Sequence, residues 1–203
     1  AERVFPLFRV IKINEPVPLD AEIEAVYTNA GHILGACSIA LTLENKTLVF
    51  SGDIGRDNDV LMHPPTKPTK ADYIFLESTY GNRIHPDTDV KAELEMYINN
   101  TVKKGGTIII PSFAVERAQM VMYLLWQLKE EKKIPNIPYI IDTPMGISVL
   151  EIFQNNRKWH KLPEHEYIAM CKMFTMIRDY QETIDTIYNK QSKVVIAASG
   201  MIT

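Results

Sequence analysis

A strand followed by a helix is predicted by residues 107–128, which read T-I-I-I-P-S-F-A-V-E-R-A-Q-M-V-M-Y-L-L-W-Q-L. The apolar run 107–110 is typical of a buried strand, and Pro111 is expected to end it because proline has no N–H for the sheet. A helix should follow from about residue 115 to 132, because apolar side chains recur there at helical spacing. These side chains are Met120, Val121, Leu124, Leu125 and Leu128.

The alternation of strand and helix continues on both sides of this unit. A helix ending near residue 104 is predicted before it, capped by Asp87 or Thr88, and strands are predicted after it at 139–141 and 194–198. Such alternation indicates a parallel sheet covered by helices on both faces. Ligands of these sheets sit beyond the carboxyl ends of the strands. The sequence places polar clusters there: Pro111-Ser112-Phe113, Asp142-Thr143-Pro144-Met145 and Ser199-Gly200-Met201.

The first part of the chain has a different pattern. Apolar and polar side chains alternate with period two in residues 38–43. A second strand is expected at residues 47–50 after a short turn, so a β-hairpin is predicted. A short buried strand is expected at about 73–76. We therefore expect an α/β chain of two domains, a β-rich one at 1–84 and an α/β one at 85–203.

Composition excludes several classes of function. The 203 residues carry a net charge of −3, so the chain as a whole is not a basic nucleic-acid binder. No apolar stretch approaches the roughly 20 residues that span a bilayer, and no signal peptide is visible. The two cysteines, Cys37 and Cys171, are too far apart for a zinc knuckle and suggest reduced thiols in a cytoplasmic protein.

Three apolar strands each end at a polar side chain that suits metal chemistry. These ends are Ala30-Gly31-His32, Ser51-Gly52-Asp53 and Leu76-Glu77. Imidazole and carboxylate are ligands of catalytic Zn²⁺, and a carboxylate such as Asp53 can bridge two metals. Glu77 could orient a metal-bound histidine or transfer a proton. Each residue alone is more often a turn or capping residue, but three in succession favour a metal site.

These motifs resemble metallo-β-lactamase/β-CASP nucleases, the family that includes the pre-mRNA 3′-end cleavage factor. The resemblance rests on A-G-H-I-L-G-A (30–36), F-S-G-D-I-G (50–55) and E-S-T-Y-G (77–81), and then on I-P-S-F-A-V-E-R-A-Q (110–119), D-T-P-M (142–145) and A-S-G-M (198–201). It implies the C-terminal part of a metallo-β-lactamase αββα fold at 1–84, followed at 85–203 by a β-CASP domain with a mainly parallel sheet flanked by helices.

The resemblance also implies roles for particular residues. His32 and Asp53 would hold zinc, with Asp53 bridging two ions, and Asp53 and Glu77 would be catalytic. Arg117, Ser199 and Gly200 would contact the substrate, single-stranded RNA. The implied activity is a zinc-dependent ribonuclease in RNA processing or decay. The sequence does not separate an endonuclease from an exonuclease, and it leaves a homodimer open.

One departure from the family pattern is large. The motif His-x-His-x-Asp-His occurs nowhere in the sequence, and two later histidine motifs are also missing. We therefore expect an incomplete portion of the enzyme, with most zinc ligands outside this chain. His63, His85, His160 and His165 lie in polar loops and are expected to be exposed rather than to replace them.

Two other functions stay open on sequence alone. One is a hydrolase of the metallo-β-lactamase fold that acts on a small thioester or lactone. This function would give the α/β domain at 85–203 no role. The other is a non-catalytic module that binds RNA or a protein without metal. An upstream His-x-His-x-Asp-His motif would favour the nuclease over both.

Overall fold

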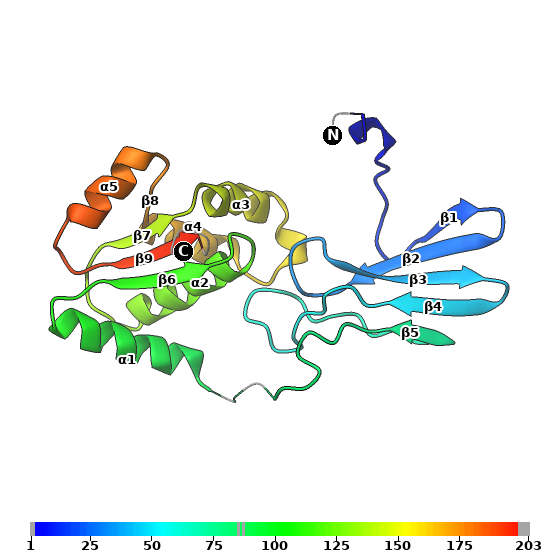
Figure 1. Cartoon of the computed structure of the whole chain (residues 1–203), viewed down its shortest axis with the longest axis horizontal. Helices are drawn as coiled ribbons and strands as arrows, with labels where there is room; N and C mark the ends of the chain where they lie inside the picture. Colours follow the sequence, from blue (N-terminus) through cyan, green and yellow to red (C-terminus); the bar gives the residue numbers. More distant parts are fainter. Residues whose placement is uncertain (1–2, 85, 87, 199–203) are drawn as a thin grey trace. The chain divides into compact units, whose positions relative to one another are not determined.

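The structure is a computed structural model that describes residues 3–84, 86 and 88–198. The chain divides into two compact units, Ala1–Ile84 and His85–Thr203. Each unit has its own sheet (Figure 1), and the predicted α/β class is confirmed. Within the described ranges, no helix combines the length and apolar character needed to cross a membrane.

The first unit is built on a sheet whose described strands follow the order β1-β2-β3-β4-β5. The strands β1 to β4 pair antiparallel, and β5 joins β4 in parallel. As a result β2, β4 and β5 run in the same direction, and their carboxyl ends share one edge of the sheet. The elements are the 3-10 helix η1 Phe5–Leu7 and the strands β1 Pro16–Asp20, β2 Ile23–Asn29, β3 Cys37–Leu43, β4 Lys46–Phe50 and β5 Tyr73–Phe75.

The predicted hairpin is formed by β3 and β4. Its two turn residues, Glu44 and Asn45, have φ angles of 48° and 67°, which a tight two-residue hairpin requires. The strand β1 was not predicted, because it contains Pro16 and Pro18. Proline is accommodated there since β1 lies at an edge of the described sheet.

The second unit contains a parallel sheet whose described strands follow the order β6-β9-β7-β8. The strands are β6 Ile108–Ser112, β7 Tyr139–Asp142, β8 Phe174–Met176 and β9 Val194–Ala198. The helices are α1 Val90–Lys103, α2 Arg117–Glu130, α3 Pro144–Asn155, η2 Arg157–Trp159, α4 Glu164–Met173 and α5 Tyr180–Tyr188. In Figure 1 the ends of β6, β9 and β7 lie side by side, so the polar residues that follow β6 and β7 lie at one edge of the sheet.

Helices lie against both faces of this sheet, as predicted. On one face Lys129 of α2 lies 5.2 Å from the centre of the Tyr139 ring, and fully buried Ile141 and Ile196 share that side. On the opposite face the Thr183 hydroxyl of α5 donates to Asp142 Oδ1 at 3.0 Å. Fully buried strand side chains thus lie on the side that α2 covers, and Ile140 and Val195 of the opposite face form a second buried cluster with Ile177.

Several features differ from the prediction. The strand expected to be buried at 73–76 is β5, whose residues are more than half exposed, and α2 begins at Arg117 rather than near residue 115. The cap of α1 is Asp89, whose carboxylate accepts hydrogen bonds from the N–H groups of Lys91 and Ala92. The strand β6 continues through Pro111 to Ser112, because β6 is an edge strand of the described sheet and Pro111 needs no donor on the open side.

The parallel pair β4 and β5 is fastened by Asp72. Its N–H donates to the Thr47 carbonyl at 2.8 Å, and its carboxylate accepts the Thr47 N–H at 2.8 Å and the Lys46 ammonium at 3.3 Å. These two donors, Thr47 first, hold the pKa of the Asp72 carboxyl below its ordinary value.

We predict that Asp72→Asn lowers the free energy of unfolding near neutral pH. The wild-type advantage should be full above the ordinary carboxyl pKa of about 4 and should vanish as pH falls through the lower folded-state pKa, because the protonated carboxyl then resembles the amide. Urea unfolding of both proteins at several pH values measures this difference. If the difference in unfolding free energy between the two proteins stayed constant into strong acid, the ionised carboxylate of Asp72 would not be its cause.

Candidate functional site

The first candidate ligand, His32, lies in the loop after β2, and its side chain is exposed. The loop is closed by the Ala30 N–H, which donates to the Ala36 carbonyl at 2.9 Å. Gly31 has a φ of 68°, and a Cβ there would lie 2.7 Å from the His63 carbonyl oxygen. Only glycine meets both conditions, so the residue before His32 fixes the path of the loop.

The second candidate, Asp53, lies in the loop after β4 and is also exposed. Gly52 turns the chain there with a φ of 58°. Two residues after Asp53, the Gly55 N–H donates to the Ala30 carbonyl at 2.8 Å. A Cβ on Gly55 would lie only 1.8 Å from the Gly31 carbonyl oxygen. The Asp53 loop is therefore in direct backbone contact with the His32 loop.

The third candidate, Glu77, follows β5 and is half-buried. Its Oε1 accepts the Ile54 N–H at 2.7 Å, and its Oε2 accepts the Thr79 hydroxyl at 2.9 Å. Because Ile54 follows Asp53 directly, Glu77 holds the Asp53 loop from the other side. The structure thus brings the three predicted loops together at one edge of the sheet.

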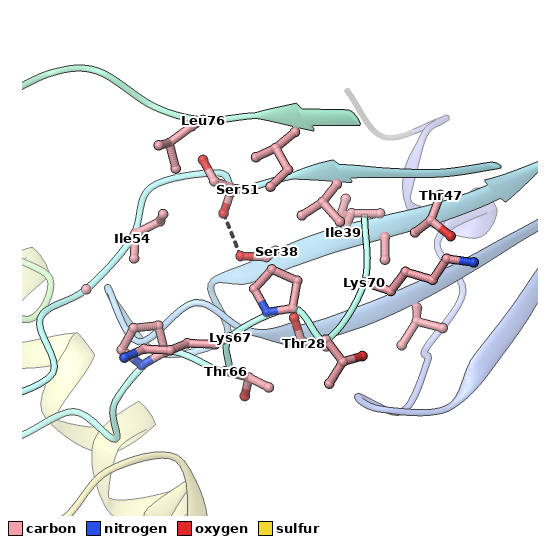
Figure 2. A pocket seen from close by; sticks show the side chains of 18 of the residues that line it. Thr28, Ser38, Ile39, Thr47, Ser51, Ile54, Thr66, Lys67, Lys70 and Leu76 are labelled. Atoms are coloured by element: carbon pink, nitrogen blue, oxygen red, sulfur yellow. Dashed lines mark hydrogen bonds between the residues drawn. The ribbon is translucent and has the colours of Figure 1, made fainter. Parts of the chain in front are cut away.

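Ser51 is an organising residue that sequence reasoning did not identify. It is 5% exposed, and its hydroxyl accepts the Glu77 N–H at 3.0 Å and donates to the Gly52 carbonyl at 2.7 Å. The Ser38 hydroxyl donates to the Ser51 carbonyl at 2.7 Å (Figure 2). The only sequence signal was a serine between an apolar strand and Gly-Asp, which is also common in ordinary turns.

A cavity of about 740 Å³ adjoins these loops on one side of the sheet (Figure 2). Its walls are sheet residues such as Thr28 and Ile39 and the segment 65–70. Ser51, Ile54 and Gly55 line its end, whereas the lining residues do not include His32, Asp53 or Glu77. The cavity is therefore distinct from the candidate metal ligands.

The side chains at this edge are of the types that bind zinc, but there are too few of them for a complete site. His32 offers a nitrogen and Asp53 a carboxylate, while both oxygens of Glu77 already accept hydrogen bonds. Across the described ranges, no group of three or more His, Cys, Asp or Glu side chains could hold a metal ion. Burial raises the pKa of the nearby Cys37 thiol, so the thiolate that would bind a metal is disfavoured. A catalytic zinc takes three protein ligands.

The predicted substrate contacts belong to the second unit. Arg117 is the first residue of α2, its side chain is 56% exposed, and its Nε lies 3.9 Å from Glu116 Oε2. Ser199 and Gly200 lie outside the described residues.

The prediction of an exposed His160 was wrong. It is 4% exposed, its Nδ1 accepts the Leu162 N–H at 3.2 Å, and its Nε2 lies 3.0 Å from the Phe153 carbonyl. It therefore has a packing role. His165 is exposed as expected, His63 is partly buried and His85 lies outside the described residues.

We predict that Gly55→Ala destabilises the first unit by at least about 2 kcal/mol, because the added methyl group meets backbone that cannot rotate away. Chemical denaturation measures the loss. Gly81→Ala is the matched control, since its Cβ would approach nothing closer than 3.3 Å. Equal stability of the two variants would show that the contact between the loops is not tight.

Comparison with known protein families identifies the second unit. The Beta-Casp domain model matches residues 118–203. Among curated proteins, Ribonuclease TTHA0252 of Thermus thermophilus is 37% identical over 147 residues, which is 71% of this chain and 33% of that protein.

Two further relatives match more of the chain at lower identity. The RNase J-like protein of Methanocaldococcus jannaschii is 27% identical over 182 residues, 87% of this chain and 42% of that protein. Endoribonuclease YSH1 of Eremothecium gossypii is 28% identical over 183 residues, 86% of this chain and 24% of that protein. The chain thus spans less than half the length of these relatives. It belongs to the β-CASP family.

Proposed function

We propose that the whole protein carrying this chain is a zinc-dependent ribonuclease that hydrolyses phosphodiester bonds of single-stranded RNA in RNA processing or decay. The observation that supports this most is the junction of the His32, Asp53 and Glu77 loops through the Gly55–Ala30 and Ile54–Glu77 hydrogen bonds. The names of the relatives, ribonuclease and endoribonuclease, point to the same substrate class.

In this proposal the first unit is part of a metallo-β-lactamase domain and the second is a β-CASP domain. In it, His32 and Asp53 would hold the metal through an imidazole nitrogen and a carboxylate. When bound, zinc lowers the pKa of a water ligand and stabilises negative charge on the phosphate. Further ligands must come from outside the described residues, because two donors do not complete a catalytic site. We therefore propose no activity for the 203 residues alone.

Glu77 is proposed to act by positioning Asp53. A carboxylate whose two oxygens accept the Ile54 N–H and the Thr79 hydroxyl is held in place and fixes the backbone next to Asp53. This arrangement suits a carboxylate that orients Asp53 better than one that transfers a proton. The chemistry needs such support, because a shift of about 1 Å in a ligand can cost two orders of magnitude in rate.

Substrate contacts are proposed to come from Arg117, Ser199 and Gly200. The exposed guanidinium of Arg117 offers a rigid fork of donors that matches a phosphate. With a net charge of −3, the chain should bind RNA through such local groups and bound metal rather than through its overall field. The two free cysteines support a cytoplasmic location for the protein.

We predict that Asp53→Ala lowers the rate of RNA cleavage by the whole protein at least about a thousandfold, because a proposed metal ligand is lost. The variant should remain folded, since Asp53 lies in an exposed loop. Cleavage of end-labelled RNA and circular dichroism are measured together. A folded variant with unimpaired cleavage would remove Asp53 from the site.

A second prediction separates the two roles of Glu77. If it positions Asp53 through the Ile54 N–H, Glu77→Gln should retain most of the cleavage rate, because the amide oxygen still accepts that bond, while Glu77→Ala should lose it. If Glu77 transfers a proton, glutamine and alanine should be equally inactive. Single-turnover cleavage rates of the two variants distinguish these cases.

A further inference from the structure

The turn between β6 and α2 has an unusual backbone. Glu116 has a φ of 64° and a ψ of −54°, and the Arg117 N–H donates to the Val115 carbonyl at 2.8 Å across it. This three-residue turn with positive φ at its centre is rare and strained in L-amino acids. A residue persists in such a conformation only where its surroundings hold it there, and such residues concentrate at ligand-binding positions.

The surroundings of this turn are well defined. The side chain of Gln119 is fully buried, and its Nε2 donates to the Ala114 carbonyl at 3.0 Å and to the Gly146 carbonyl at 3.2 Å. This residue ties the turn to the start of α3. The Ala118 N–H donates to the Phe113 carbonyl at 3.1 Å, which ties the first turn of α2 to the end of β6. The backbone of Phe113 is thus fixed on both sides.

The fixed turn directs an aromatic side chain outward. Phe113 is 72% exposed although it follows a strand whose last residue, Ser112, is 3% exposed. Arg117, four residues further on, is also exposed, and Met145 at the start of α3 is 67% exposed. An exposed ring and an exposed guanidinium carried by one hydrogen-bonded turn, at the carboxyl edge of a parallel sheet, fit a ligand that is both flat and anionic.

We propose that Phe113 is a base-stacking residue that binds one nucleobase of the RNA, while Arg117 binds an adjacent phosphate. This inference rests on the proposed function, because single-stranded RNA is the ligand that presents both groups together. Every base has a face that can stack on phenylalanine, so the contact adds affinity without sequence preference. A ring fixed by a rigid turn loses little conformational freedom when the base binds.

The test is RNA binding by the whole protein, with Asp53→Ala added to all variants to stop cleavage. A labelled oligouridine of about ten nucleotides is titrated by fluorescence anisotropy at several salt concentrations. Phe113→Ala should weaken binding about tenfold with an unchanged salt slope, and Phe113→Tyr should bind as the parent does. Arg117→Ala should weaken binding and reduce the slope by about 0.7, the loss of one phosphate contact.

Two controls make the result specific. Tyr188→Ala removes an aromatic side chain of α5 that is 77% exposed and should leave binding unchanged. A sugar–phosphate chain without bases should bind equally well to the parent and to Phe113→Ala, because no base is present to stack. If Phe113→Ala weakens this chain equally, or leaves oligouridine binding unchanged, the stacking role is wrong while the ribonuclease proposal stands. If this parent binds no RNA, the stacking role is wrong, and the ribonuclease proposal fails as well only if the protein with Asp53 intact and zinc added leaves the RNA uncleaved.

Discussion

The hydrogen bond from the Gly55 N–H to the Ala30 carbonyl joins the loop of His32 to the loop of Asp53. It forms only because Gly55 lacks a side chain, since a Cβ there would overlap the Gly31 carbonyl. The neighbouring Ile54 N–H extends the junction to Glu77. The positions of the candidate ligands therefore depend on backbone contacts between strand ends, which hold a site more firmly than contacts between mobile side chains.

Both units use the direction of their strands in the same way. In the first unit β2, β4 and β5 run together and deliver the three polar loops to one edge. In the second unit β6, β9 and β7 are parallel. Phe113 follows β6, and Arg117 and Met145 lie at the starts of the helices that come after β6 and β7. Gln119 links the first of these turns to the start of α3, as Glu77 links two loops in the first unit. We infer that each unit supplies a rigid edge, one for metal and one for RNA.

Much of this arrangement could be predicted from the sequence. Period-two alternation gave the β3–β4 hairpin, and apolar runs before polar clusters gave β6, β7 and β9 together with the edges where the candidate residues lie. The strand β1 is hidden in the sequence by Pro16 and Pro18. The helix α4 has no side-chain cap and depends on buried Tyr167 and Met170, whereas α5 carries a local signal that sequence reasoning overlooked, because Asp179 caps its first turn.

Roles that depend on long-range contacts could not be predicted. Nothing local to Ser51 indicates that its hydroxyl accepts the Glu77 N–H, and nothing local to His160 indicates burial against Phe153. The strain at Glu116 is likewise invisible in the sequence, because it arises where β6, α2 and α3 meet. The metal is indicated by three polar strand ends in succession and by family resemblance, and the two donors of this chain support it only in part.

We propose that the joined loops of His32, Asp53 and Glu77 hold part of a metal site for RNA cleavage. The most direct measurement is to strip the whole protein of metal with a chelator, add end-labelled single-stranded RNA, and then restore zinc. We expect cleavage to stop on chelation and to return with zinc, with a product ladder that distinguishes internal from terminal cutting. Cleavage that persists in the stripped protein, or a folded and zinc-loaded protein that leaves the RNA intact, would contradict this proposal.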